Sequence, residues 1–178
     1  PSEEAVIKAV MNEAGADFSK LNIVGSDGSG IAGLSDEVGK NKVNLGWEFY
    51  GWAIIKALQD RYDLNYMPLA DLDNRLDYYT PVIITNKKMI KKNSDTVKKF
   101  MEATKKGYEY AIDHPSKAAE ILHEDALSDT DLKFLKESQK YLSSQYAKDA
   151  DSWGVMKDSV WDNYTDFMYE TGLISQKI

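Results

Sequence analysis

Residues 43–52 read VNLGWEFYGW, and this stretch predicts a strand that passes into a helix. Its first five residues are typical of a strand, and the helical spacing of apolar residues from Tyr50 to Arg61 predicts a helix. The runs LNIVG at 21–25 and LNYM at 64–67 also have the composition of strands. Because strands alternate with helices, the pattern favours right-handed crossovers and a mainly parallel sheet, that is, an α/β fold.

A helix is expected over 2–14 with Gly15 at its end, and YTPVIITN at 79–86 is expected to be a strand. After residue 86 the sequence has a different pattern. Beyond it, helices are expected near 94–113, 115–124, 129–144 and 153–171, the last one capped by Gly172. The chain is therefore expected to divide near residues 78–86 into an α/β part and an all-helical part.

The overall composition excludes some classes of partner and site. The chain has 178 residues, a formal charge of −7 and no cysteine, so disulfides and thiolate metal sites are excluded. The acidic balance argues against nucleic acid or an anionic membrane as a partner. The chain opens with a helix start at Pro1 and Ser2, which indicates the C-terminal part of a longer protein. Apolar helix faces around Phe100, Tyr108, Trp153 and Trp161 would then be uncovered, so self-association is expected.

Candidate binding residues follow the predicted strands. Ligands of parallel sheets bind beyond the carboxyl ends of the strands, which is where Asp27 and Glu48 are expected. Aromatic faces suit a flat heterocycle, and a carboxylate accepts hydrogen bonds from its N–H groups. We therefore predict a pocket for a small planar solute; the alternative is that the two tryptophans at 47 and 52 are core. The predicted binding residues are Asp27, Trp47, Glu48, Tyr50 and one or both of Tyr78 and Tyr79.

Other chemical motifs are weaker. Residues 28–33 (GSGIAG) match the glycine pattern of dinucleotide-binding proteins, with Glu48 at the distance expected for a ribose-binding acid. The helix that should follow is short, polar and broken by Gly39, whereas a pyrophosphate needs a sustained helix N-terminus. The acids at 71, 73 and 77 lack the glycine and glutamate of a calcium loop and are expected in a solvated loop. Both histidines, at 114 and 123, are expected to be structural. No cofactor or metal is predicted.

Five segments in order resemble the NMT1/THI5-like family of substrate-binding proteins of ABC transporters. They are PSEEAVIKAV at 1–10, VNLGWEFYGW at 43–52, DLDNRLDYYTPVIITN at 71–86, GYEYAIDHPSKAAEIL at 107–122 and WGVMKDSVWDNYTDFMYETGL at 153–173. The similarity covers the whole chain but only the C-terminal part of a family member. It implies the type II periplasmic-binding-protein fold, in which two lobes close on a ligand. In this fold residues 1–77 would form an incomplete second lobe, 78–86 a crossover strand, and 87–178 the C-terminal helices that pack on the first lobe.

The resemblance also implies a function. The chain is expected to be the extracytoplasmic solute-binding component of an ABC importer, to bind a small heterocycle such as a thiamine-pyrimidine precursor, and not to be an enzyme. Expected partners are the solute and the permease subunits, with the membrane reached only through a lipid anchor outside this chain. The alternatives are a sulfonate- or other small-anion-binding protein, a thiamine-pyrimidine-synthesising enzyme and, most remotely, a dinucleotide-binding enzyme.

The short helix after the glycine pattern gives a first testable prediction. NAD and NADP should not bind the chain with micromolar affinity, because a pyrophosphate would have no sustained helix dipole to face. Isothermal titration of either dinucleotide should give no saturable heat. A micromolar dissociation constant would instead establish residues 28–33 as a nucleotide loop.

Overall fold

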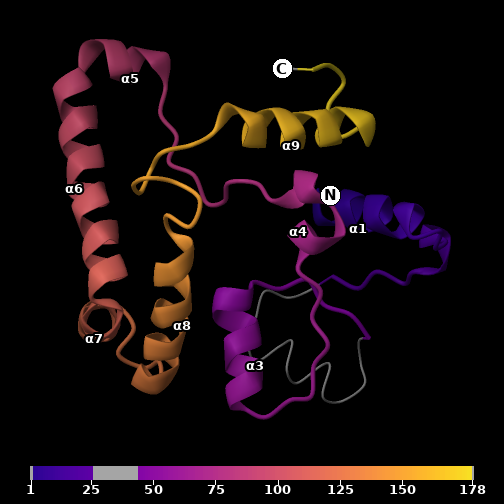
Figure 1. The fold of residues 1–178 in the computed structure, drawn as a ribbon, viewed down its shortest axis with the longest axis horizontal. Coiled ribbons are helices and arrows are strands. Elements are labelled where there is room, and N and C mark those ends of the chain that lie inside the picture. The colour runs from indigo at the N-terminus through magenta and orange to yellow at the C-terminus, as the bar shows by residue number, and fades with distance from the viewer. Residues whose placement is uncertain (1, 26–43, 178) are drawn as a thin grey trace. The chain divides into compact units, whose positions relative to one another are not determined.

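The computed structural model describes residues 2–25 and 44–177, which form two compact units (Figure 1). The first unit takes in the described residues of 1–29, 64–82 and 156–178. The second takes in those of 30–63 and 83–155. Each unit therefore combines segments that are far apart in the sequence.

The first unit contains α1 (Ser2–Glu13), η1 (Phe18–Lys20), α4 (Leu69–Leu72), η3 (Asn74–Leu76) and α9 (Asp158–Glu170). One side chain each from α1, η3 and α9 is almost fully buried: Val6, Leu76 and Phe167. Gly15 and Gly172 follow α1 and α9 with φ angles of 72° and 75°, so glycine supplies the left-handed residue after each helix.

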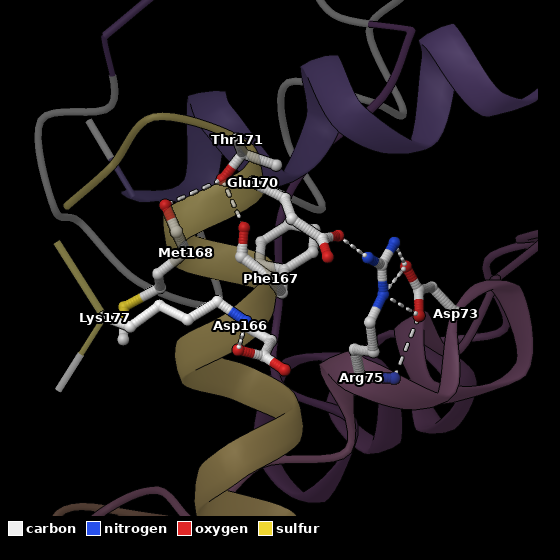
Figure 2. Close-up of polar contacts among 8 residues, drawn as sticks. All are labelled: Asp73, Arg75, Asp166, Phe167, Met168, Glu170, Thr171 and Lys177. Carbon is white, nitrogen blue, oxygen red and sulfur yellow. Dashed lines mark hydrogen bonds and ion pairs between the residues drawn. The ribbon is translucent and has the colours of Figure 1, made fainter. Parts of the chain in front are cut away.

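Arg75 links η3 to α9 in the first unit (Figure 2). Its Nη2 atom lies 2.6 Å from Asp73 Oδ2, and its Nη1 atom lies 2.6 Å from Glu170 Oε2. The guanidinium also lies over the Phe167 ring, with Cζ 5.3 Å from the centroid. Hydrogen bonds from Arg75 hold the pKa of the Asp73 carboxyl below its usual value. This stabilisation is therefore present at neutral pH and is lost as the pH falls through that lowered pKa.

The second unit contains η2 (Tyr50–Ile54), α3 (Ile55–Gln59), α5 (Lys87–Lys92), α6 (Ser94–Asp113), α7 (Pro115–Asp125) and α8 (Leu132–Gln145). Its core consists of Ile55, Ala119, Phe134 and Leu135, which come from α3, α7 and α8. The Asp131 side chain caps α8 by accepting hydrogen bonds from the backbone N–H groups of residues 133 and 134. Two helices that are adjacent in the sequence, α7 and α8, thus pack against a third from far upstream.

Two aromatic rings that were expected to be uncovered are covered within the second unit. Tyr108 of α6 stacks on Trp153, with ring centroids 4.3 Å apart, and meets the Tyr146 ring edge-on at 4.8 Å. By contrast, Phe100 remains 57% exposed, and Trp161 of the first unit remains 41% exposed. The exposed rings keep self-association a prediction, with a smaller apolar surface than the sequence indicated.

The predicted helices are confirmed and the predicted sheet is wrong. Helices at 2–13, 94–113, 115–125, 132–145 and 158–170 match the expected ranges to within a few residues, except that α9 begins five residues later than predicted. The described residues contain no strand, so the expected parallel sheet with strands at 21–25, 43–47, 64–67 and 79–86 is not formed. Residue 43 itself lies outside the described residues.

The physical reason is that a strand requires a partner. The segments at 21–25 and 83–84 have no regular secondary structure, and no inter-strand ladder of backbone hydrogen bonds joins them to another described segment. Their apolar residues are accordingly exposed: Ile23 by 52%, Val24 by 64% and Ile84 by 86%. β-Branched residues favour extended backbone locally, but pairing depends on neighbours that a local pattern does not specify.

The arginine link predicts how α9 responds to mutation. Replacing Arg75 with Met removes two ion pairs and leaves the carboxylate of Asp73, only 7% exposed, without its cation. We expect a loss of about 1–2 kcal/mol, seen by mass spectrometry as roughly five- to thirtyfold faster hydrogen exchange in residues 158–170.

Lys177→Met is the matched control, because Lys177, which follows α9, pairs with Asp166 of that helix, and both side chains are about half-exposed. It should change the exchange of α9 by less than about threefold. Equal effects of the two variants would show that Arg75 is not a specific link.

Candidate functional site

The aromatic stretch from the sequence lies against α8. The N–H of Ile55 donates to the carbonyl of Tyr50 five residues earlier, which makes η2 a single turn of π-helix, a form often found at functional sites. The Ser138 hydroxyl donates to the Gly51 carbonyl at 2.5 Å. A Cβ atom at position 51 would lie 2.7 Å from Leu142 Cδ2. Glycine at this position therefore lets the backbone of η2 approach α8 closely.

A hollow of about 420 Å³ lies where η2 and α3 meet α8. Two of its lining residues, Tyr50 and Tyr141, contact each other, with ring centroids 4.6 Å apart and planes tilted by 42°. Two others are joined by a hydrogen bond, in which Gln59 Nε2 donates to Glu137 Oε2 at 2.7 Å. The size falls in the range of small-molecule sites. The lining residues are Tyr50, Ile55, Leu58, Gln59, Lys133, Glu137 and Tyr141. We call this the tyrosine hollow.

A larger hollow of about 530 Å³ lies between the start of α7 and α8. No aromatic residue lines it, and its cationic residues include Lys136, which is paired with Glu120 at 2.6 Å. Its lining residues are Pro115, Ser116, Leu132, Lys133, Lys136, Glu137 and Lys140. We call this the lysine hollow. The tyrosine hollow is the better candidate for a planar solute, because it combines rings with a carboxylate and an amide.

The aromatic stretch divides between core and surface. Trp52 packs edge-on against Phe134, with centroids 4.7 Å apart and planes at 74°, so this tryptophan belongs to the core. Trp47 and Glu48 are half-buried, whereas Phe49 is 66% exposed. Partial burial raises the pKa of the Glu48 carboxyl, because removing a carboxylate from water disfavours its charged form.

Tyr78 and Tyr79 lie in the first unit and contact α9. The Tyr78 ring stacks on that of Tyr164, with centroids 4.1 Å apart. The Tyr79 hydroxyl accepts a hydrogen bond from the backbone N–H of Lys157 at 2.9 Å, and its ring lies 5.9 Å from that of Trp161. Burial raises the pKa of the Tyr164 phenol. Both predicted tyrosines therefore have a packing role in this unit.

The predicted site residues thus fall into separate groups. Trp47, Glu48 and Tyr50 belong to the second unit, and the two tyrosines at 78 and 79 belong to the first. Asp27 lies outside the described residues. Whether these groups surround one ligand stays a prediction.

Of the residues that line the tyrosine hollow, sequence reasoning predicted only Tyr50 as a site residue, and it missed Gln59, Glu137 and Tyr141 among others. The last two lie on α8 at a spacing of four, which places them on one face of the helix. That spacing was the only local signal of a polar and aromatic stripe. Within 2–25 and 44–177, no group of three metal-ligating side chains could hold an ion, and no helix has both the length and the apolar content to cross a bilayer.

The sequence is similar to those of known proteins. The sequence pattern of the NMT1/THI5-like family matches residues 1–118. A curated relative is the formylaminopyrimidine-binding protein of Halalkalibacterium halodurans, 24% identical over 131 residues. The alignment covers 68% of this chain and 36% of the relative, so the chain spans about a third of the length of that protein.

The division of the aromatic stretch predicts opposite effects on stability at two positions. Trp52→Ala removes a ring packed on the core and should lower the free energy of unfolding by about 2–4 kcal/mol. Glu48→Gln at pH 7 should leave it unchanged or raise it slightly, because a raised pKa means that folding disfavours the Glu48 charge. Urea titrations followed by near-ultraviolet circular dichroism measure both. A large loss of stability in the Glu48 variant would place its carboxylate in a structural contact.

Proposed function

Because the chain belongs to the NMT1/THI5-like family, we propose that it binds a small, planar solute of the thiamine-pyrimidine precursor class. The observation that carries the proposal is the tyrosine hollow, where rings and a carboxylate come together. The relative that binds formylaminopyrimidine agrees with this ligand class, and its being a binding protein agrees with a role without catalysis.

The chemistry of the hollow suits such a solute. A pyrimidine ring presents a flat face to Tyr50 or Tyr141, and an offset ring contact contributes about 0.5–1.5 kcal/mol beyond burial. Exocyclic amino groups of the ring donate hydrogen bonds, and carboxylates accept them. A hydrogen bond to the charged Glu137, which lines the hollow, contributes about 1.5–3 kcal/mol. Since carboxylates carry no donor when ionised, they favour this ring over one that presents only acceptors.

The proposal extends to transport. In this role the chain is the extracytoplasmic solute-binding part of an ABC importer, held at the membrane by a lipid anchor and delivering solute to permease subunits. Capture occurs by closure of a cleft, as in other binding proteins that enclose a ligand between two parts. Asp27, Trp47 and one of the tyrosines at 78 and 79 then complete the contacts made by Glu48 and Tyr50.

A second candidate is a sulfonate or another small anion. The lysine hollow favours it, because three lysines of α8, at 133, 136 and 140, line that hollow together. Glu120 neutralises one of them, and Glu137 adds a negative charge, so the net attraction for an anion is modest. The synthesising enzyme is less well supported, because neither histidine lines the tyrosine hollow. The His114 ring instead lies 4.9 Å from that of Tyr110.

Isothermal titration with formylaminopyrimidine tests the proposal. Saturable binding is expected, and Glu48→Gln should weaken it by about tenfold or more, because the lost charged hydrogen bond is worth about 1.5–3 kcal/mol. Tyr50→Ala should weaken it by a similar factor. Phe49→Ala is the matched control, because this ring is next in sequence and largely exposed, and it should leave the affinity nearly unchanged.

An alkyl sulfonate serves as the competing ligand in the same titrations. Tighter binding of the sulfonate, reduced by Lys133→Gln and Lys140→Gln, would favour the anion function. Unchanged affinity for formylaminopyrimidine in the Tyr50 variant would rule out the tyrosine hollow as its site, and unchanged affinity in the Glu48 variant would rule out a contact from Glu48.

A further inference from the structure

Charge is strongly separated along the second unit. Residues 87–106 contain eight lysines and two acids, although the whole chain has a formal charge of −7. Residues 109–131 contain seven acids and one lysine. Lysines are therefore concentrated in α5 and in the first two thirds of α6.

The fold keeps these two charged regions apart. Figure 1 shows α5 and α7 at opposite ends of α6. A helix of 20 residues is about 30 Å long, whereas charges in physiological salt are screened beyond about 8 Å. An anionic surface that approaches α5 is therefore attracted by the nearby lysines and is largely screened from the acids of α7.

Large apolar side chains lie among the lysines. Ile84 is 86% exposed, Ile90 of α5 is 52% exposed, and Phe100 of α6 is 57% exposed. All of the lysines in 87–106 are exposed except Lys105, which pairs with Glu109 on the same helix. The segment 83–106, here called the basic arm, thus combines exposed cationic and exposed apolar groups.

We propose that the basic arm binds the surface of an anionic lipid bilayer. Lysines are attracted to acidic headgroups, while exposed apolar side chains enter the boundary between headgroups and acyl chains. A soluble polyanion would use the lysines but leave Ile84, Ile90 and Phe100 in water, and these exposed side chains therefore favour lipid. The binding is peripheral, and it does not depend on the identity of the solute.

The proposal reverses an expectation drawn from the total charge. A net charge of −7 predicts repulsion from an anionic membrane. Screening makes the local charge decisive at short range, so the arm can approach such a surface while the acidic end of the second unit points away from it. The lipid surface would then orient the chain as well as bind it.

Co-sedimentation with vesicles tests this proposal. Vesicles of phosphatidylcholine with about one third phosphatidylglycerol should bind the chain, those of phosphatidylcholine alone should not, and salt at about 0.5 M should weaken the binding. Replacing the four lysines of α5, at 87, 88, 91 and 92, with Gln should reduce the partition coefficient by about tenfold or more. Phe100→Ser and Ile90→Ser together should reduce it severalfold without changing the charge.

The matched control removes the same charge elsewhere. Lys8, Lys20, Lys148 and Lys157 are all exposed, and their replacement with Gln should reduce binding much less than the α5 variant does. Circular dichroism establishes that every variant keeps its helices. The proposal is overturned if the two fourfold variants lose binding equally. It is also overturned if polyglutamate or a DNA duplex binds as tightly as the vesicles and the Phe100 and Ile90 changes have no effect, because the arm would then be a general polyanion surface.

Discussion

The hydrogen bond from the Ser138 hydroxyl to the Gly51 carbonyl determines how the second unit is built. It joins residues 87 positions apart, in a buried contact between η2 and the middle of α8. A hydrogen bond of this kind contributes about 0.5–1.5 kcal/mol to stability. Because glycine at position 51 leaves no Cβ in the way, η2 comes close enough for Trp52 to reach Phe134 and for Tyr50 to reach Tyr141. The core and the tyrosine hollow thus follow from one close approach of backbone to helix.

The helices could be predicted because their signals are local. Gly15 and Gly172 end helices through their own backbone freedom, and His114-Pro115 separates α6 from α7 through the restriction that proline imposes on the residue before it. The sheet could not be predicted reliably for the opposite reason. Ile83 and Ile84 have the composition of a strand, but a strand forms only when another segment satisfies its hydrogen bonds.

The candidate site could be predicted only in part. Tyr50 stood out because rings and an acid are concentrated in a few residues, whereas Tyr141 and Glu137 reach the tyrosine hollow from α8 through tertiary packing, and Glu48 does not line it. The acidic loop was misinterpreted. Asp73 was expected in a solvated loop, yet its carboxylate is 7% exposed and paired with Arg75, two residues along. Composition marked the loop as polar, but only the position of α9, which supplies Glu170 and Phe167, explains why this arginine is held in place.

The lysines of α5 also affect the folding of that helix. Lys87 and Lys91 are four residues apart, as are Lys88 and Lys92, and like charges at this spacing repel one another on a helix surface. Two effects offset this repulsion in part. The Asn86 side chain caps the helix by accepting a hydrogen bond from the N–H of Met89, and the two lysines in the last turn interact favourably with the helix dipole. Ionic strength therefore acts on α5 in two opposite ways: added salt relieves the repulsion and favours the helix, while it weakens any attraction to an oppositely charged surface. In dilute buffer, therefore, α5 is most costly to form, and its attraction to an oppositely charged surface is strongest.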